Sequence, residues 1–263
     1  MDNSYKTPSK VAVVTGATGD IGWAVTQRLM LDGYYVHAVG RQHHLLRKLQ
    51  LDVLGRSGQV HEVELTNPEE TQALGELACK TTGRIDLVVA CAGRAETCSL
   101  QYAPAAHYLK MYEDNVMVTV NLYQATSKRM ATYGNFVAIG SDSVVLGAVG
   151  LSAYAAAKAA LRCLVKSWSI EQARFNVRVN MISPGPVRSK LLTSLLGSDT
   201  PESLALFEHS IAPRLLSEPE DVAGHVMNLL AKGDIRFTGK QLVCYHDQIA
   251  NGRNGLLGVR LTG

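Results

Sequence analysis

Short apolar runs rich in β-branched residues recur along this chain of 263 residues, and longer segments with helical patterns separate them. Strands that alternate with helices in this way are typical of βαβ units, which build a mostly parallel sheet. The pattern predicts a doubly wound α/β fold of about seven strands, with helices on both faces of the sheet. After the third run, Thr66 or Asn67 is expected to cap a helix that begins at Pro68. The seven runs cover residues 11–15, 35–39, 61–64, 86–90, 135–139, 177–181 and 241–244.

The length and a hydrophobic content of 46% predict one domain over residues 1–263 with a single large core. Residues 186–218 depart from the alternation and carry leucine-rich helical pieces. Because they follow the C-terminal end of a strand, where such sheets bind ligands, we expect a substrate lid there. A packed helical hairpin is the alternative. Residues 245–263 form an atypical C-terminal tail.

Charge and cysteine content exclude several classes of partner. The formal net charge is only +3, and Lys and Arg are scattered, so no nucleic-acid surface is expected. The first ten residues are polar and no apolar run approaches the ~20 residues of a membrane span, which predicts a cytoplasmic protein without membrane contact. The five cysteines form no C-x-x-C pair and are expected to be reduced thiols. His43 and His44 lack a third ligand at metal spacing, so surface histidines and no metal are expected.

A glycine-rich turn at Thr15–Gly22 follows the first predicted strand and opens a helix, as in dinucleotide-binding turns. Gly16 permits the tight turn, Gly19 lets the backbone approach a pyrophosphate, and Gly22 allows close helix packing. The helix N-terminus then faces the phosphates. Asp20 would oppose a pyrophosphate, so its carboxylate is expected to point away from the cofactor. A strand, turn and helix without a ligand is the alternative. Thr18 and Ile21 complete the turn residues expected to contact the cofactor.

At the end of the second strand, the sequence Val39-Gly40-Arg41 replaces the acidic residue that would bind the ribose 2′-hydroxyl of NAD. Gly40 does not repel a 2′-phosphate, and the planar fork of Arg41 is suited to clamp one. NADP(H) is therefore favoured as the cofactor, with NAD(H) as the alternative. Arg47 and Lys48 are interpreted as solvated surface charges.

Ser141, Tyr154 and Lys158 carry the strongest chemical signal. The Ala-rich run from Ala153 to Leu161 predicts a helix, on which positions four apart share a face, so the Tyr154 phenol and the Lys158 ammonium converge. A tyrosine has a pKa of about 10, and moving it three units toward neutrality needs about 4 kcal/mol of differential stabilisation. A partly buried ammonium is able to supply it. The alternative is a tyrosine ring that packs on an aliphatic stem.

In their order along the chain, these features resemble the short-chain dehydrogenase/reductase family from about residue 10 to residue 239. The matching elements are the glycine turn, Cys91-Ala-Gly93 after the fourth strand, Asn115 on the next helix, Ser141, the Tyr154–Lys158 pair, and Pro184-Gly185 after the sixth strand. The family implies a Rossmann-like sheet of seven strands, in which a hydride passes between nicotinamide and a carbonyl or carbinol carbon.

The resemblance implies a role for each residue that matches. Tyr154 would be the general acid in reduction and the general base in oxidation, and Ser141 would hydrogen-bond the reacting oxygen. Lys158 would lower the pKa of Tyr154 and hold the nicotinamide ribose. Asn115 would support a proton relay to the lysine, and Asn121 competes for that assignment.

The resemblance also implies further cofactor contacts. Ser189 stands where the family has a threonine near the nicotinamide amide, and Glu64-Leu65 stands where an Asp and an apolar residue contact the adenine. The remaining residues expected to line the cofactor are Cys91, Ala92, Gly93, Pro184, Gly185 and Val187, together with Tyr154 and Lys158.

Three departures from the family pattern stand out. The turn reads TGxxGxxG in place of TGxxxGxG, a spacing found in longer members that act on nucleotide sugars. Ala90-Cys-Ala-Gly93 replaces Asn-Asn-Ala-Gly. Near the C-terminus, Tyr245-His-Asp247 replaces Asp-Gly-Gly, a segment that commonly makes subunit contacts. The resemblance still implies a homo-oligomer, a dimer or a tetramer.

The sequence thus predicts an NADP(H)-dependent carbonyl reductase or alcohol dehydrogenase with a small-molecule substrate. Val144–Gly147 and the lid leucines predict a largely apolar ketone or secondary alcohol. A non-catalytic nucleotide-binding regulatory protein is one alternative, and an epimerase or dehydratase that recycles its NAD(P) is another. Polar substrate groups have candidate anchors in Arg94, Glu96, Arg188, Lys190 and Arg214.

Overall fold

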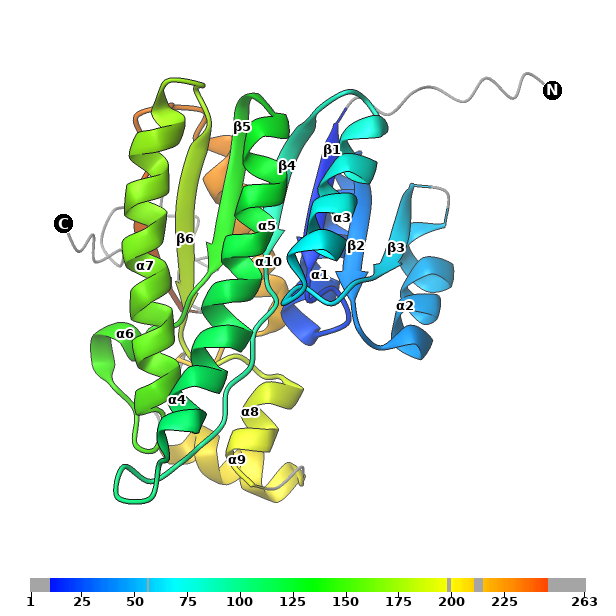
Figure 1. Cartoon of the computed structure of the whole chain (residues 1–263). Helices are drawn as coiled ribbons and strands as arrows, with labels where there is room; N and C mark the ends of the chain where they lie inside the picture. Colours follow the sequence, from blue (N-terminus) through cyan, green and yellow to red (C-terminus); the bar gives the residue numbers. More distant parts are fainter. Residues whose placement is uncertain (1–9, 56, 198–199, 211–214, 246–263) are drawn as a thin grey trace.

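The computed structural model describes residues 10–55, 57–197, 200–210 and 215–245. These residues contain a seven-stranded sheet with the strand order β3-β2-β1-β4-β5-β6-β7, and every neighbouring pair is parallel (Figure 1). The expected Rossmann-like sheet is confirmed. The strands are β1 (Val11–Thr15), β2 (Tyr35–Gly40), β3 (Gly58–Glu62), β4 (Ile85–Ala90), β5 (Met130–Ile139), β6 (Arg178–Pro184) and β7 (Gln241–Cys244).

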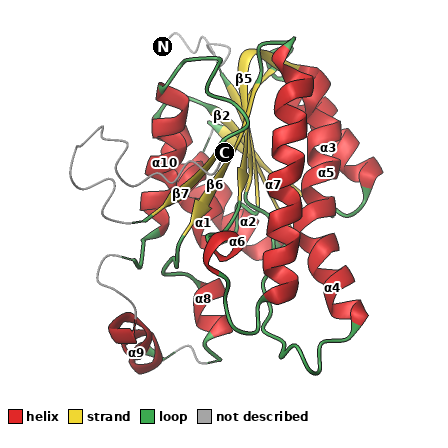
Figure 2. Cartoon of the chain, turned by 90° about the vertical axis from the view of Figure 1, so that its left-hand side faces the viewer, coloured by secondary structure: helices red, strands yellow, loops and turns green. Residues whose placement is uncertain are grey.

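Helices cover both faces of the sheet (Figure 2). On one face, α1 (Asp20–Leu31) and α10 (Pro219–Ala231) bury residues such as Leu29 and Val226 against the strands. On the other face, α3 (Pro68–Lys80), α5 (Val118–Thr126) and α7 (Ser152–Ala173) form a second core. The shorter elements are α2 (His43–Leu49), η1 (Gln50–Leu54), α4 (Ala105–Tyr112), η2 (Glu113–Met117), η3 (Ser127–Arg129), α6 (Ser143–Leu146), α8 (Lys190–Leu195) and α9 (Pro201–Ser210).

The third strand is shifted relative to the sequence prediction, because it begins at Gly58 and ends at Glu62 rather than covering 61–64. Gly58 pairs with Val36 of β2, and a Cβ atom at position 58 would collide with the Val36 carbonyl oxygen. Only glycine fits this close approach, and glycine is depleted in ordinary strands. Local propensity therefore missed the true start of β3.

The start of α3 follows the prediction. Asn67 caps the helix, since its side-chain oxygen accepts hydrogen bonds from the backbone N–H groups of Glu69 and Glu70 at 3.0 and 3.3 Å. Pro68 occupies the first turn, where its missing N–H costs nothing. The cap fixes where the chain turns back toward the sheet after β3.

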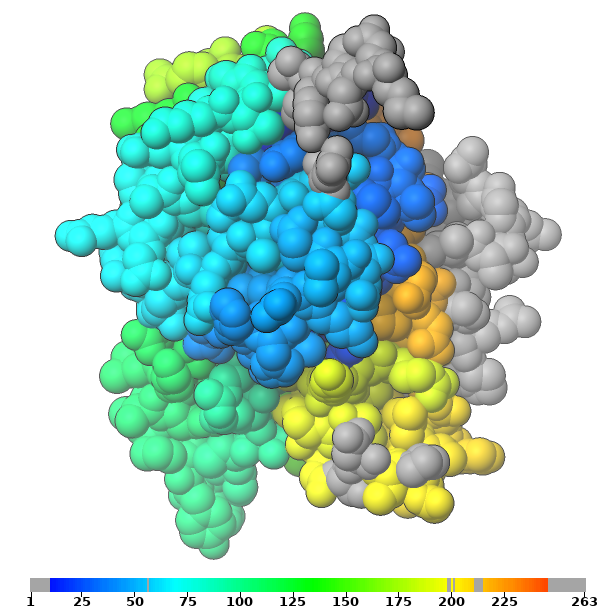
Figure 3. Space-filling view, turned by 90° about the vertical axis from the view of Figure 1, so that its right-hand side faces the viewer, coloured from blue at the N-terminus to red at the C-terminus, as the bar shows by residue number. Residues whose placement is uncertain are grey.

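The carboxyl ends of the parallel strands meet at one edge of the sheet, and α8 and α9 lie beyond that edge (Figure 1). The segment around residue 100 projects beyond the same edge, and Figure 3 shows the two segments as separate lobes with an indentation between them. Parallel sheets bind ligands at this edge, where the strand order reverses between β1 and β4.

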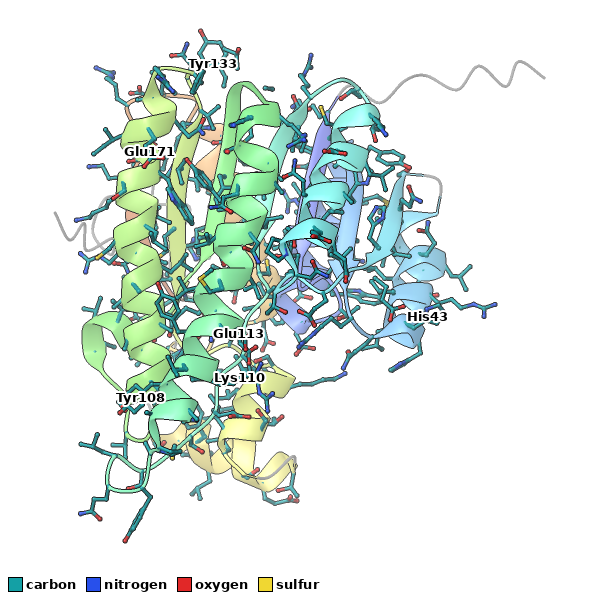
Figure 4. All side chains as sticks on the ribbon, viewed as in Figure 1. His43, Tyr108, Lys110, Glu113, Tyr133 and Glu171 are labelled. Atoms are coloured by element: carbon teal, nitrogen blue, oxygen red, sulfur yellow. The ribbon has the colours of Figure 1, made fainter. Side chains whose placement is uncertain are left out.

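The histidine pair of the sequence analysis begins at the surface. His43 lies on α2 at the outer edge of the molecule (Figure 4), with 79% of its side chain exposed and Nδ1 3.2 Å from Glu62 Oε2. Among the described residues, no group of three or more His, Cys, Asp or Glu side chains is placed to hold a metal ion. In the same part of the chain, no helix combines the length and apolarity that a membrane span requires. Residues 246–263 of the predicted tail lie outside the described residues.

A pair of histidines, of which His37 is buried and His61 partly buried, links β2 and β3. His37 Nδ1 lies 2.9 Å from His61 Nε2, and His37 Nε2 lies 2.9 Å from the Thr81 hydroxyl. Burial lowers the pKa of His37 to about 4, and the nearby His61 adds to the effect. The same burial lowers the pKa of His61. Both rings are therefore neutral at pH 7.

This pair predicts a loss of stability in mild acid. As the pH falls below about 6.5, the unfolded chain takes up a proton that folded His37 refuses until about pH 4. Between pH 7 and pH 5 this linkage lowers the free energy of unfolding by about 2 kcal/mol. Urea unfolding at both pH values measures it. Most of that difference should vanish in His37→Leu, and an unchanged difference would contradict the assignment.

Candidate active site

The glycine turn is shaped by close backbone contacts. Gly16 has a φ of +63°, and a Cβ atom there would lie 2.8 Å from the Ala92 backbone nitrogen. A Cβ atom on Gly22 would collide with the Gly16 carbonyl oxygen. Gly19 caps α1 and has no side chain to bind the first N–H groups of the helix. These donors suit a pyrophosphate, so the turn fits a dinucleotide.

Asp20 occupies the position of the second glycine in TGxxxGxG, because Thr15 to Gly22 has the same length in both patterns. Its carboxylate accepts a hydrogen bond from the Lys190 backbone N–H at 2.8 Å. Lys190 is the first residue of α8. Asp20 therefore ties the glycine turn to the base of the segment predicted to be a lid.

A cavity of about 290 Å³ opens beside the glycine turn. Two lysines line it, Lys48 from α2 and Lys190 from α8, so the exposed Lys48 borders the candidate cofactor site. The remaining lining residues are Thr18, Gly19, Asp20, Trp23, Ala24, Leu45, Pro219 and Glu220. Ile21 instead packs its side chain against the core under α1.

Packing also favours glycine at position 40, which the sequence did not reveal. A Cβ atom there would lie 2.9 Å from Thr18 Cγ2. Arg41 follows it at the surface, with its Nη1 3.5 Å from Glu64 Oε2. Burial of Glu64 opposes ionisation, but hydrogen bonds from Thr66 and the charge of Arg41 lower the pKa of the carboxyl. Both partners are largely exposed, so the pair is weak and leaves Arg41 able to move to a phosphate.

Leu65 is buried beside this pair, and Asn121 holds it there. The Asn121 Nδ2 donates a hydrogen bond to the Leu65 carbonyl at 2.8 Å. Asn121 thus supports the wall expected to face the adenine.

Ser141, Tyr154 and Lys158 come together at the carboxyl end of β5. Ser141 lies just beyond that strand, and Tyr154 and Lys158 lie near the start of α7 with exposed fractions of 8% and 4%. The Ser141 hydroxyl lies near enough to the Tyr154 phenol to act on its pKa as a hydrogen-bond partner. Lys158 Nζ lies 5.7 Å from the centre of the Tyr154 ring and donates a hydrogen bond to the Ile139 carbonyl at 2.9 Å.

The pKa of Tyr154 differs from the sequence expectation. Burial raises the pKa of Tyr154 to about 12, the hydrogen bond with Ser141 partly offsets this, and the charge of Asp142 adds to the rise. Burial also lowers the pKa of Lys158 to about 8. Taking both groups out of water thus outweighs the predicted effect of the ammonium on the phenol. In this structure Tyr154 is a protonated donor at neutral pH.

Asn115 lies in η2, a π-helical turn inserted between α4 and α5. Its Nδ2 donates to the carbonyls of Arg94 and Met111 at 2.8 and 2.9 Å, and its Oδ1 accepts from the Arg94 N–H at 3.2 Å. A Cβ atom on Gly93 would lie 2.7 Å from Asn115 Oδ1 and 3.3 Å from Lys158 Nζ. Asn115 and Lys158 therefore both lie against Gly93, where the lack of a side chain leaves room for the two polar groups.

Cys91 lies between the glycine turn and Lys158. Burial raises the pKa of its thiol to about 12, although the charge of Lys158 acts in the opposite direction. The thiol is therefore neutral and unreactive at physiological pH. Ala92 donates its N–H to the Thr15 hydroxyl at 3.3 Å, which joins the ends of β1 and β4.

The Pro184-Gly185 loop closes the site on the β7 side. A Cβ atom on Gly185 would lie 2.5 Å from the Tyr245 ring, and the Tyr245 hydroxyl donates to Asp142 Oδ2 at 3.4 Å. Val187 is buried and forms a β-bridge with Ser217. The Ser189 side chain caps α8 by accepting a hydrogen bond from Leu192 N–H at 3.3 Å.

The sequence analysis did not place three residues that lie near the catalytic candidates. These are Asp142, Ser143 and Tyr245, and all three lie within reach of Ser141, Tyr154 or Gly185. The repeated hydroxyl in Ser141-Asp-Ser143 was the available signal for two of them. Burial raises the pKa of Asp142, whereas hydrogen bonds, first from Tyr245, act against the rise.

Two of the candidate polar anchors pair with each other, and a third pairs with carboxylates outside that set. Arg94 forms an ion pair with Glu96, and Arg188 contacts Glu208 of α9 at 2.6 Å and Glu218 at 2.8 Å. Arg188 thereby ties α9 to the start of α10. Arg214 lies outside the described residues.

Comparisons with known proteins point to one family. A family model described as short chain dehydrogenase matches residues 10–198. The Short-chain dehydrogenase/reductase FrzI of Cladobotryum sp is 29% identical over 260 residues, which cover 95% of this chain and 96% of that protein. The vibriobactin-specific 2,3-dihydro-2,3-dihydroxybenzoate dehydrogenase of Vibrio cholerae is also 29% identical, covering 85% of this chain and 89% of its own length.

A solved structure shares the fold. The crystal structure of a dehydrogenase/reductase from Sinorhizobium meliloti 1021 has a TM-score of 0.77, at 23% identity, and the match covers 89% of this chain and 93% of that chain. The relatives are named for redox reactions, which does not favour the regulatory or isomerase alternatives.

Proposed function

The chain belongs to the short-chain dehydrogenase family of oxidoreductases, and on this premise we propose that it transfers a hydride between NADP(H) and a small ketone or secondary alcohol. The observation that carries the proposal is the meeting of Ser141, Tyr154 and Lys158 at the sheet edge that also holds the glycine turn. A protein that only binds a nucleotide has no use for a phenol, a hydroxyl and an ammonium at one point.

The proton chemistry belongs to the residues of this chain. When bound, the nicotinamide cofactor donates or accepts the hydride. In reduction, Tyr154 gives its proton to the carbonyl oxygen as charge develops there, while Ser141 donates a hydrogen bond to the same oxygen. Lys158, charged below its pKa of about 8, stabilises the phenolate that Tyr154 becomes and binds the ribose hydroxyls. Asn115 helps to return a proton toward Lys158. In oxidation, Tyr154 acts in reverse as the base.

Cofactor binding is proposed to follow the chain from the glycine turn to the lid. Gly16, Gly19 and Gly22 with Thr18 and Ile21 would hold the pyrophosphate, and Arg41 would favour the 2′-phosphate of NADP(H). The adenine would lie on Glu64 and Leu65. The nicotinamide half would lie against Cys91, Ala92, Gly93, Pro184, Gly185, Val187 and Ser189. We propose that residues 186–218 close over it as a lid.

The substrate is proposed to be a largely apolar carbonyl compound or alcohol. Exposed apolar side chains on helices that lie toward the carboxyl edge of the sheet support this, among them Leu146 of α6, Leu109 of α4 and Leu206 of α9. The V. cholerae relative is named as a 2,3-dihydro-2,3-dihydroxybenzoate dehydrogenase. Oxidation of an alcohol and reduction of a ketone therefore both belong to the proposal for this chain. We also propose a dimer or tetramer, as the family resemblance implies.

Replacement of Tyr154 tests the reaction. Tyr154→Phe should lower kcat about 10²–10⁴-fold, because the general acid is lost. NADPH should still bind, and at one hundred times its Kd it should raise the free energy of unfolding by about 2.7 kcal/mol. Turnover of a carbonyl panel and thermal unfolding measure the two effects. The control is Tyr133→Phe, at the opposite end of the molecule (Figure 4). Full turnover in Tyr154→Phe would refute the proposed mechanism.

Replacement of Arg41 tests the cofactor preference. Arg41→Ala should weaken NADPH binding about 10- to 100-fold, since charged hydrogen bonds to the 2′-phosphate are lost. NADH binding should change less than about twofold. Fluorescence titration of both cofactors measures this, with Arg47→Ala on the exposed side of α2 as the matched control. An equal loss of affinity for both cofactors would show that Arg41 does not recognise the phosphate.

A further inference from the structure

Ser143 lies two residues after Ser141, at the start of α6, with an exposed fraction of 7%. Its hydroxyl donates a hydrogen bond to Ser141 Oγ at 2.9 Å, and its backbone N–H also points at Ser141 Oγ, at 3.2 Å. Both contacts thus come from donors on the same residue and converge on one oxygen of the candidate site.

A serine hydroxyl has one proton and two acceptor lone pairs. The two donors of Ser143 occupy the acceptor side of Ser141 Oγ. What remains to Ser141 is its own O–H, which is available to donate to Tyr154 or to a bound substrate. In this arrangement Ser141 donates to its surroundings and has no lone pair left to receive the proton of Tyr154.

This orientation is the one that carbonyl reduction requires. A carbonyl oxygen only accepts hydrogen bonds, and the negative charge that develops on it is stabilised by donors aimed at it in advance. A freely rotating Ser141 hydroxyl would spend part of its time accepting from Tyr154, which would hold back the proton that the reaction transfers. We propose that Ser143 is a positioning residue that fixes Ser141 as a hydrogen-bond donor to the reacting oxygen. The inference rests on the proposed oxidoreductase function.

A purely structural role for Ser143 makes a different prediction. The backbone of Ser143 also starts α6, because its carbonyl accepts a hydrogen bond from the Gly147 N–H at 3.0 Å. That bond does not involve the side chain, so it survives removal of the hydroxyl. A role limited to folding would lower stability without acting through Ser141.

A double-mutant cycle separates the two roles, using Ser143→Ala, Ser141→Ala and the double variant. Removal of a donor aimed at the oxyanion costs on the order of 10²–10³-fold in kcat, and Ser143 acts one step away, so Ser143→Ala should lower kcat about 10-fold. The KM for the carbonyl and the Kd for NADPH should change less than about twofold. In the Ser141→Ala background, the same replacement should lower kcat by less than about twofold.

Two further variants complete the experiment. Ser143→Thr keeps the hydroxyl and should recover most of the lost kcat. Ser169→Ala, the matched control, removes another buried serine hydroxyl that is bonded at 2.7 Å to the Lys166 carbonyl, far along α7, and should leave kcat unchanged.

The outcomes distinguish failure of this inference from failure of the proposed function. If Ser143→Ala leaves kcat unchanged, or lowers it equally with and without Ser141, the positioning role is refuted while the oxidoreductase function stands. If the wild-type chain binds NADPH but reduces no carbonyl of the panel, the proposed function fails, and the positioning role fails with it.

Discussion

The buried ammonium of Lys158 is the group on which the geometry of the site depends. A charged side chain that is only 4% exposed destabilises the folded state unless a polar partner binds it. The Ile139 carbonyl at the end of β5 accepts a hydrogen bond from Lys158 Nζ at 2.9 Å. Gly93 leaves the space that Nζ needs, and Asn115 closes the other side of that glycine. The ends of β4 and β5, the π-helical turn and α7 are thus held around one nitrogen.

The cofactor end is built by a similar close approach. Gly16 lies against the Ala92 backbone, so the turns after β1 and β4 touch where the strand order of the sheet reverses. Asp20 then connects the glycine turn to α8, which lies 170 residues further along the chain. The candidate phosphate site, the catalytic residues and the segment proposed to close over them therefore share one edge of the sheet.

Much of this arrangement follows from local patterns in the sequence. The spacing of Tyr154 and Lys158 on a helix, the Asn67 cap and the alternating strands each depend on neighbouring residues, so the sequence reveals them. Tertiary contacts decide the rest. Burial, which sets the pKa of Tyr154 above rather than below its ordinary value, arises only when α7 packs on the sheet. The pairing of Arg41 with Glu64 and the lone pairs that Ser143 occupies likewise require the fold.

The most direct test of the account is the pH dependence of kcat/KM for NADPH, measured with a saturating carbonyl substrate, since this parameter reports groups of the free enzyme. Lys158 is charged below its pKa of about 8 and neutral above it, and the site needs the charge. We expect a value that is constant from pH 6 to about pH 7 and falls about tenfold per pH unit well above pH 8. A value that stays constant up to pH 10 would contradict the role given to the buried lysine.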